Sequence, residues 1–258
     1  MSAMADLAGK TIVVTGAGRG LGRSMAESVS KKGAKVALIA RNTEQLEETA
    51  EICRKAGAPD ARVYSVNVAD EQAVDQAFDS IASDLGRIDG LVNNAGVTRD
   101  GLLLKVKDGK VVKTMSMEQW QTVIDINLTG VFLCGRAAAR HMVEQGDGGC
   151  IVNIASVVRS GNMGQSNYSA TKAGVESLTV TWAKELSRYK VRVGAVSPGY
   201  CATEMVTSIA DEVLDKIKGG IPLKRLAEPE EIAHAVCFVF ENDYLTGRLV
   251  EIDGGLRI

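Results

Sequence analysis

The sequence predicts an α/β fold in which one doubly wound parallel sheet is flanked by helices. Short β-branched or apolar runs alternate along the chain with amphipathic segments of helical period. The first run, at residues 10–15, leads through a glycine-rich turn into a helical segment. The 258 residues contain no internal repeat, linker or low-complexity tract, so we expect a single domain over 1–258.

Composition excludes several classes of protein. Hydrophobic residues at 45% and charged residues at 24% are typical of a folded globular protein. The net charge is −2 and no basic stripe alternates with aromatic residues, so we expect no nucleic-acid partner. The five cysteines are scattered and never form C-x-x-C, which indicates reduced thiols and no metal site. Neither an apolar signal region nor a run of 18 apolar residues occurs, so we expect a cytoplasmic protein without a membrane span.

The turn after the first strand is a candidate dinucleotide site. Its spacing is T-G-x-x-x-G-x-G rather than the generic G-x-G-x-x-G, and a helix is expected at 23–32. Glycines let the backbone approach a pyrophosphate, and a helix N-terminus offers it free N–H groups. The alternative is a tight connection without a ligand. The residues of this turn are Gly16, Gly18, Arg19, Gly20, Leu21 and Gly22.

The second strand, expected at 35–40, ends in Ala40 and Arg41. NAD-binding folds usually place an acid at this position, against the ribose hydroxyls. Arg19 and Arg41 could instead bind a 2′-phosphate between them, which a carboxylate would repel. NADP(H) is therefore favoured over NAD(H), the alternative being that both arginines are solvated surface charges.

The alternation of strands and helices continues to the C-terminus. We expect strands at 61–68, 88–93, 150–155, 191–197 and 249–252, and helices at 43–55, 70–85, 117–144, 167–188 and 228–241. This order implies a Rossmann-type parallel sheet that is covered on both faces. Asn94, Ala95 and Gly96 follow the fourth strand, at the edge where a cofactor would lie in such a fold.

Two segments interrupt the alternation. The runs 104–107 and 110–113 flank Asp108-Gly109, a pair that favours a type I′ turn, and so predict a hairpin insertion near 102–117. Its four lysines are most simply a solvated face that protects a strand edge, or alternatively they contact phosphates of a long substrate arm. Residues 200–220, irregular to helical between glycines, occupy the position of a substrate lid.

Ser156, Tyr168 and Lys172 form a candidate catalytic group. Ser156 follows a strand, and the i, i+4 spacing of Tyr168 and Lys172 puts the phenol and the ammonium on one helix face. A free tyrosine titrates near pH ~10, and we expect the neighbouring cation to lower that pKa. Tyr168 could then exchange a proton with a carbonyl oxygen that Ser156 hydrogen-bonds. By itself, Tyr-x-x-x-Lys is common enough to be an ordinary helix turn.

With these motifs in order, the chain resembles the short-chain dehydrogenase/reductase family over essentially its full length. The shared motifs are TGAGRGLG at 15–22, NNAG at 93–96, Asn127, Ser156, YSATK at 168–172 and PG at 198–199. Within the family it looks most like the bacterial 3-oxoacyl-[acyl-carrier-protein] reductases. That likeness lies in Asn67-Val68, TRD at 98–100, PGYCATEM at 198–205 and IPLKRLAEPEEI at 221–232.

The resemblance implies an NADPH-dependent oxidoreductase that reduces a 3-oxoacyl thioester to the 3-hydroxyacyl thioester, as in fatty acid biosynthesis. The substrate would be carried on an acyl carrier protein or CoA, and the enzyme would be a homotetramer. The implied catalytic residues are Asn127, Ser156, Tyr168 and Lys172. Lys172 would lower the tyrosine pKa and bind the nicotinamide ribose. Asn127 would hold a water that returns the proton to the tyrosine through Lys172.

The resemblance also implies a set of cofactor contacts. Asn93, Asn67 and Val68 would flank the adenosine half, and Thr203 would touch the nicotinamide amide. The implied cofactor-binding residues are Gly16, Gly18, Arg19, Gly20, Leu21, Gly22, Arg41, Asn67, Val68, Asn94, Ala95, Gly96, Tyr168, Lys172, Pro198, Gly199 and Thr203.

Two other functions stay open at this point. The same chemistry could act on another small ketone, a secondary alcohol or a sugar, and a non-catalytic dinucleotide-sensing module is a more distant alternative. The 102–117 region is longer than we expect of the subfamily, and the turn 144–147 is acidic, although acidic carrier proteins usually dock on basic surface. The alternative docking residues are Arg136, Arg140, Lys184, Arg188 and Lys190.

Overall fold

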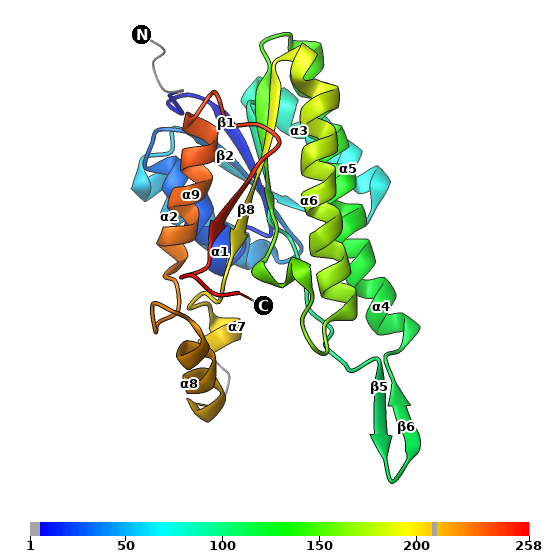
Figure 1. Cartoon of the computed structure of the whole chain (residues 1–258). Coiled ribbons are helices and arrows are strands. Elements are labelled where there is room, and N and C mark those ends of the chain that lie inside the picture. The colour runs from blue at the N-terminus through cyan, green and yellow to red at the C-terminus, as the bar shows by residue number, and fades with distance from the viewer. Residues whose placement is uncertain (1–5, 208–210, 258) are drawn as a thin grey trace.

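The structure, a computed structural model, describes residues 6–207 and 211–257. Seven parallel strands form one sheet in the order β3-β2-β1-β4-β7-β8-β9, with helices on both faces (Figure 1). This confirms the predicted fold class. The strands are Thr11–Thr15 (β1), Lys35–Ala40 (β2), Ala61–Ser65 (β3), Gly90–Asn93 (β4), Gly149–Ile154 (β7), Val191–Pro198 (β8) and Leu249–Ile252 (β9).

The central strands are buried on both faces, as their continuous apolar runs predict. All residues of β1 and β4 are buried, and so are the four inner residues of β2. The chain winds outward from β1 through β2 to β3, and then crosses back to β4 and continues through β7 to β9. The direction of winding therefore changes between β1 and β4, and the crevice at the carboxyl ends of these strands is where such sheets bind ligands.

Each face of the sheet has its own hydrophobic core. One core packs α1, α2 and α9 against the sheet, and the other packs α3, α5 and α6, as the two groups of helices in Figure 1 show. Amphipathic helices bury one apolar stripe each, which is why the sheet needs helices on both sides. The helices are Gly20–Ser30 (α1), Thr43–Ala56 (α2), Glu71–Leu85 (α3), Met117–Ile124 (α4), Gly130–Gln145 (α5), Ser166–Leu186 (α6) and Pro229–Glu241 (α9).

Several predicted boundaries were wrong by a few residues. Helix α1 begins at Gly20 rather than residue 23, because the last glycines of the turn already form its first turn. Strand β3 ends at Ser65, three residues before the predicted end, and β4 begins at Gly90 rather than 88. Asn67 and Val68 consequently lie in the loop after β3, beyond the hydrogen-bonded ladder.

The predicted helix at 117–144 is interrupted. A π-helical turn at Asp125–Thr129 joins α4 to α5, and such turns occur frequently at functional sites. By length and composition the continuous stretch Met117–Gln145 could cross a membrane. Half of its most apolar part is buried inside the fold, and core helices meet the same criterion, so this is weak support for a membrane span.

Residues 104–114 form an antiparallel hairpin that is separate from the main sheet. Its strands are Leu104–Lys107 (β5) and Lys110–Thr114 (β6), and it projects from the body of the protein just before α4 (Figure 1). Asp108 and Gly109 have φ angles of 50° and 73°, as a two-residue type I′ turn requires.

The segment 200–220 contains two short helices. They are Glu204–Thr207 (α7) and Asp211–Gly220 (α8), while residues 208–210 of this segment lie outside the described residues. Leu214 of α8 packs with Ile221 and Leu226 in a third, small apolar cluster. The segment therefore has its own packing, separate from the two main cores, and its role as a lid stays a prediction.

Candidate active site

The glycine turn packs directly against the loop that follows β4. A Cβ atom on Gly16 would lie 2.9 Å from the Cα atom of Ala95. A Cβ atom on Gly22 would lie 2.2 Å from the carbonyl oxygen of Gly16 and 2.7 Å from the Asn94 side-chain nitrogen. Only glycine fits at either position, so the backbone forms the floor of the crevice between β1 and β4.

Thr15 holds this floor in place. Its hydroxyl accepts hydrogen bonds from the backbone N–H groups of Asn94 (2.9 Å) and Ala95 (3.1 Å), and donates one to the carbonyl of Val92 (3.2 Å). The Asn94 side chain donates in return to the Thr15 carbonyl, at 3.0 Å. Sequence analysis missed the role of Thr15, whose only signal was a hydroxyl at the end of a buried strand.

The N-terminus of α1 suits an anionic group. Helices α2, α3 and α4 each have an N-terminal side-chain cap, from Asn42, Asp70 and Ser116. In contrast, the Arg19 side chain does not cap α1, and no acidic residue lies in its first turn. A helix N-terminus without a side-chain cap or an acidic first turn suits an anionic ligand such as the pyrophosphate of a dinucleotide.

Arg19 and Arg41 lie on neighbouring loops at one end of this cradle. A Cβ atom on Gly18 would lie 3.2 Å from the Gln45 side chain and 3.8 Å from the Ala40 Cβ, so the glycine turn meets the end of β2. Both arginines are exposed. The Arg19 guanidinium lies 4.0 Å from the Glu204 carboxylate. An exposed ion pair at that distance contributes little to stability, so the guanidinium can change partners at little cost.

The three residues expected near the adenosine half are placed differently from one another. Asn67 is exposed, whereas Val68 is buried against α5, where a Cβ on Gly130 would lie 2.8 Å from it. The interpretation of Asn93 was wrong: its side chain is 2% exposed and donates to the Asn153 side chain at 2.9 Å. Asn93 therefore points into the sheet-helix interior, because odd and even residues of β4 face opposite sides.

The segment after β8 completes the opposite wall. The Gly199 N–H donates to the Ile252 carbonyl at 2.9 Å, and a Cβ on Gly199 would lie 2.8 Å from the Asp253 backbone. Pro198 before it is buried at the end of β8. Thr203 lies close to the glycine turn, with its side chain 3.7 Å from where a Cβ of Gly20 would lie.

The catalytic candidates lie together beside this crevice. Ser156 follows β7 and precedes a short 3-10 turn, Val157–Ser160, while Tyr168 and Lys172 lie on consecutive turns of α6. The Lys172 nitrogen is 5.5 Å from the centre of the Tyr168 ring and donates to the Ile154 carbonyl at 2.7 Å. Strand β7 thus supplies both the serine and the acceptor that positions the lysine.

The expected lowering of the tyrosine pKa by Lys172 was wrong for this structure. Burial raises the pKa of Tyr168 to about 12, which outweighs the opposing effect of the Ser156 hydroxyl, and the charge of Asp100 raises it further. Burial also lowers the pKa of Lys172 to about 8. Both shifts follow from desolvation, which disfavours a phenolate and an ammonium alike. Burial therefore favours the protonated phenol of Tyr168.

Asn127 lies in the π-helical turn and is fully buried. Its side-chain oxygen accepts from the Val97 N–H at 2.8 Å, and its side-chain nitrogen donates to the Val97 carbonyl at 2.9 Å. This pair of bonds fixes the loop after Gly96 to the helix. Because the side chain is already engaged at both ends, the predicted water-holding role stays a prediction.

Arg159 is a further residue of the site that sequence analysis missed. It lies in the turn after Ser156, is 17% exposed, and contacts Glu176 on α6 (2.8 Å), Ser197 on β8 (3.1 Å) and Glu251 on β9. The guanidinium of Arg159 is the largest cause that holds the pKa of Glu251 below its usual value. It therefore ties the serine loop to the helix that carries Tyr168 and Lys172. Nothing in the local pattern marks this arginine, because its three partners lie far away in sequence.

Comparisons with known proteins agree with this geometry. A family model described as enoyl-(acyl carrier protein) reductase matches residues 16–257. The 3-oxoacyl-[acyl-carrier-protein] reductase FabG of Aquifex aeolicus is 40% identical, over 97% of this chain and 98% of that protein. The 3-oxoacyl-[acyl-carrier-protein] reductase of a Synechocystis strain is 41% identical, over 98% of this chain and 99% of that protein.

Solved structures show the same fold at clear sequence similarity. A short-chain type dehydrogenase/reductase from Mycobacterium marinum superposes with a TM-score of 0.87 at 35% identity, covering 97% of this chain and 96% of that one. A chain provisionally described as a gluconate dehydrogenase from Agrobacterium tumefaciens has the same TM-score at 33% identity, with the same coverage. The chain belongs to the short-chain dehydrogenase/reductase family, oxidoreductases that act on C=O or CH–OH groups with a nicotinamide dinucleotide.

Proposed function

We propose that this protein is an NADPH-dependent reductase of 3-oxoacyl thioesters. The observation that carries the proposal is the group of Ser156, Tyr168 and Lys172 beside a glycine-lined dinucleotide cradle. The names of relatives that are 40% and 41% identical over nearly the whole chain support this substrate class.

The residues of the site divide the chemistry between them. When bound, the nicotinamide cofactor supplies the hydride that reduces the ketone carbon. Tyr168, kept protonated by burial, donates its proton to the oxygen as negative charge develops there, and the Ser156 hydroxyl donates a hydrogen bond to the same oxygen. The cationic Lys172 stabilises the tyrosinate that the transfer leaves behind, because an opposite charge within about 6 Å favours a charged form.

The preference for NADPH belongs to the same proposal. Arg19 and Arg41 are exposed on adjoining loops, where they would hold a 2′-phosphate, and Ala40 lies where NAD-binding folds usually have a carboxylate. Arg41→Asp should raise the KM for NADPH about 10- to 100-fold, since each lost charge-assisted contact costs about 1.5–3 kcal/mol. An unchanged ratio of NADPH to NADH activity would contradict the preference.

We further propose a single-domain cytoplasmic homotetramer. All five cysteines are buried free thiols, as a reducing compartment requires. Helices α5 and α6 expose Phe132 (43%) and Val180 (38%), which suits burial between subunits, whereas Trp182 packs inward on Gly135. Residues 200–220 are proposed as the substrate lid, supported by Thr203 reaching the glycine turn.

The proposal is tested with three substrates, by NADPH oxidation for the two thioesters and by NADP⁺ reduction for the third. Acetoacetyl thioesters should be reduced, whereas a crotonyl thioester should not, which separates ketone reduction from the enoyl reduction that the family model's description names. Gluconate with NADP⁺ tests the alternative of a secondary alcohol or sugar substrate, which the description of one structural neighbour suggests. Cofactor binding without turnover on any of the three would favour the dinucleotide-sensing alternative.

The variant Tyr168→Phe tests the assigned proton donor. Turnover should fall about 10²- to 10⁴-fold, the range of general acid catalysis, while NADPH binding measured by fluorescence stays within about two-fold, since the ring remains in place. A fully active variant would overturn the assignment of Tyr168.

A further inference from the structure

The hairpin of β5 and β6 has two chemically different faces. Residues that pair across the strands lie on the same face, and the pairs are Lys105 with Lys113, Lys107 with Lys110, Val106 with Val111 and Leu104 with Thr114. A register shift between Lys105 and Val106 leaves Val112 as an extra residue. Without that bulge Lys110 and Lys113 would face opposite sides, so the bulge gathers all four lysines on one face.

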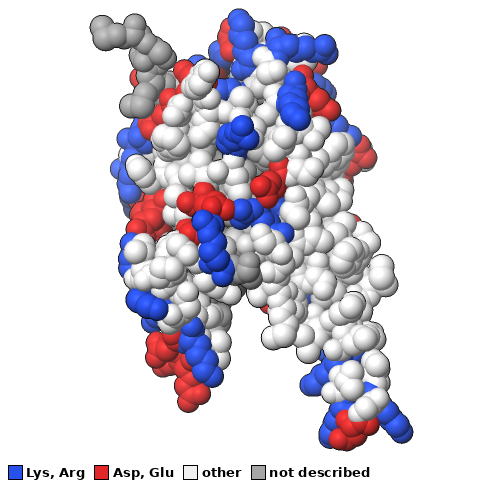
Figure 2. Space-filling view, viewed as in Figure 1, with Lys and Arg blue, Asp and Glu red and all other residues white. Residues whose placement is uncertain are grey.

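This lysine face does not stabilise the hairpin. Like charges directly opposite each other on neighbouring strands are destabilising, and both lysine pairs have that arrangement. Every residue of the two strands is exposed, and in the described chain no carboxylate forms an ion pair with any of the four ammonium groups. Figure 2 shows basic side chains gathered at the end of this arm. A cluster that weakens its own scaffold points to an external anionic partner.

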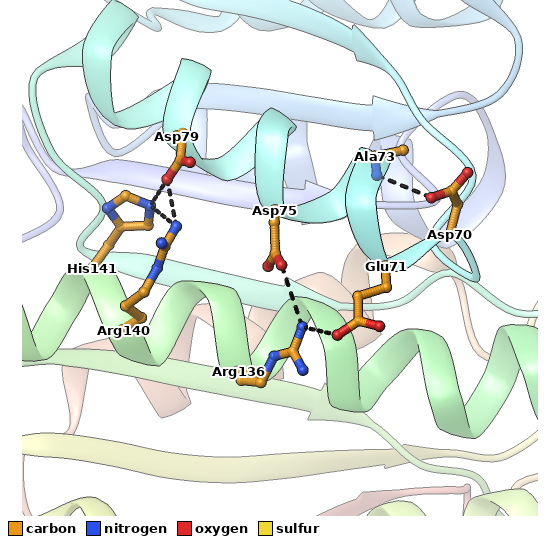
Figure 3. Close-up of polar contacts among 8 residues, drawn as sticks. All are labelled: Asp70, Glu71, Ala73, Asp75, Asp79, Arg136, Arg140 and His141. Carbon is orange, nitrogen blue, oxygen red and sulfur yellow. Dashed lines mark hydrogen bonds and ion pairs between the residues drawn. The ribbon is translucent and has the colours of Figure 1, made fainter.

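Two of the other basic residues expected to dock a carrier are already paired. Arg136 of α5 contacts Glu71 at 2.8 Å and Asp75 at 3.4 Å, and Arg140 contacts Asp79 (Figure 3). The expectation that these two arginines form a free basic docking surface was therefore wrong, because α3 supplies a carboxylate for each. The four hairpin lysines, in contrast, form no ion pair within the part of the chain that the structure describes.

The opposite face of the hairpin is apolar and also exposed. Val106 and Val111 form a cross-strand pair at 57% and 56% exposure, and Leu104 on the same face is 51% exposed. A two-stranded hairpin with no third layer is marginal in water, so this surface gains stability when something covers it. A partner that fits the arm therefore carries both carboxylates and apolar side chains.

The base of the hairpin is fastened to the helix that carries Tyr168. Gly101 pairs with Gln165 in an isolated bridge, and its N–H donates to the Gly164 carbonyl at 2.8 Å. Gln165 also donates to the Asp100 carboxylate at 3.0 Å, and Asn167 donates to the Arg99 carbonyl at 3.0 Å. The hairpin and the α7–α8 segment project on either side of the same end of the molecule (Figures 1 and 2). The arm consequently stands beside the opening to the catalytic tyrosine.

We propose that this hairpin is a docking arm for an acidic acyl-carrier protein that presents the thioester substrate. The proposal rests on the proposed function and names its protein partner. Basic charge beside the opening would steer an acidic carrier toward Tyr168, and the apolar face would bind the carrier once it arrives. The charged tip, Lys107 to Lys110, argues against insertion into a lipid bilayer. A two-fold contact between two copies through the lysine face would bring like charges together, which opposes a second copy as the occupant of that face.

The test compares substrates that share one acyl group and differ in what carries it. Acetoacetyl is supplied on acyl carrier protein, on CoA, and on neutral N-acetylcysteamine, and NADPH oxidation is followed at several salt concentrations. The arm variant replaces all four hairpin lysines with glutamine. The control variant carries the same change in charge at the opposite end of the sheet, with glutamine at the exposed residues Lys10, Lys31, Lys32 and Lys55.

The proposal predicts a loss that depends on the carrier. In the arm variant, kcat/KM for the carrier-bound substrate should fall about 10- to 100-fold at low salt and lose most of its salt dependence. Activity on the N-acetylcysteamine and CoA thioesters, and every activity of the control variant, should stay within about two-fold. A second variant, in which a two-glycine turn replaces residues 104–114, should give the same selective loss, since the Met115 N–H already lies 3.2 Å from the Leu103 carbonyl.

Other results would overturn the inference. An equal loss of kcat/KM on the CoA and carrier thioesters would mean that the lysines bind phosphates of the substrate itself, which is the alternative stated in the sequence analysis. If the arm variant keeps its kinetics on the carrier substrate but changes its oligomeric state, the arm contacts a second copy of the chain. If it keeps those kinetics but loses binding to anionic vesicles, the arm contacts a membrane. If none of the three thioesters is reduced by the unaltered enzyme, the proposed function itself fails, and that result is distinct from an arm variant that behaves like wild type.

Discussion

Asn153→Ala should destabilise the protein strongly, although the residue touches neither substrate nor cofactor. Its side chain lies between β4 and α6 and is fully buried. The oxygen accepts from the Asn93 side chain at 2.9 Å, and the nitrogen donates to the Thr179 hydroxyl at 2.9 Å. Thr179 in turn donates to the Val175 carbonyl at 2.8 Å. This chain of bonds ties α6, the helix that carries Tyr168, to the centre of the sheet.

The size of the effect follows from what the substitution leaves unpaired. The Asn93 amide would keep only a 3.4 Å contact with the Val131 carbonyl, and a buried donor without a good partner costs about 1–3 kcal/mol. The small cavity adds about 1 kcal/mol. The sum is about 2–4 kcal/mol, which corresponds to a decrease in Tm of roughly 5–15 °C for a chain of this length.

The assay is urea unfolding followed by circular dichroism, with a double-mutant cycle. Asn153→Ala and Thr179→Val remove the two ends of one hydrogen bond, so their effects should couple by about 0.5–3 kcal/mol. Thr181→Val is the matched control, because Thr181 lies on the same helix and is exposed, and its effect should stay within about 0.5 kcal/mol.

Two results would refute the reasoning. One is a free energy of unfolding for Asn153→Ala within about 0.5 kcal/mol of wild type, the range of neutral surface substitutions. The other is strict additivity of Asn153→Ala and Thr179→Val. Either result would mean that the buried hydrogen bonds of Asn153 add nothing to the free energy of unfolding beyond what hydrogen bonds to water provide in the unfolded chain.

Three further predictions follow from single positions. Lys172 has a pKa of about 8 in the folded protein and 10.5 in the unfolded chain. Because the unfolded chain binds this proton more tightly, the free energy of unfolding rises with pH. Between pH 7 and 9.5, wild type should gain about 1–2 kcal/mol relative to Lys172→Met, measured by urea unfolding. Gly22→Ala should cost about 1–3 kcal/mol or more and abolish NADPH binding in titrations, because its methyl group would lie 2.2 Å from the Gly16 carbonyl oxygen. Gly18→Ala should retain NADPH binding, because its nearest contacts are side-chain atoms of Gln45 at 3.2 Å. Arg159→Met should lower kcat several-fold at unchanged KM in steady-state kinetics, with partial recovery in Arg159→Lys.

Each of these has an outcome that contradicts it. A stability difference between wild type and Lys172→Met that is flat with pH would show that the lysine is not desolvated. Equal cofactor affinity in Gly22→Ala and Gly18→Ala would show that the turn relaxes around a methyl group. If Arg159→Met raised KM without changing kcat, the arginine would contribute to binding rather than to the position of the serine.

The positions of most strands and helices could be predicted from sequence because their causes are local. The buried run TIVVT and the glycines after it predict β1, the turn and α1 without any knowledge of the partners. The same holds for the hairpin, since Asp108-Gly109 selects its turn type wherever the hairpin lies. Ser156, Tyr168 and Lys172 could be chosen because they combine a strand end with an i, i+4 spacing.

The catalytic electrostatics depended on burial, which is a tertiary property. Spacing put Lys172 next to Tyr168 and suggested a lowered tyrosine pKa. In the folded protein, burial of Tyr168 raises its own pKa, and burial of Lys172 lowers the lysine pKa. The orientation of Asn93 likewise depended on which face of β4 meets α5 and α6. Periodicity cannot show either result, because each depends on atoms that are distant in the sequence.

By itself, the sequence determined the fold class, the order of elements and the choice of candidate catalytic residues, since these follow from hydrophobic period, turn chemistry and spacing. Tertiary structure alone decided that a π-helical turn presents Asn127, that Arg159 joins three elements, and that Thr15 supports the cradle. It also decided that one bulge turns four lysines to a single face. The physical reason is that side-chain hydrogen bonds, desolvation and strand register arise only when segments far apart in the chain pack together.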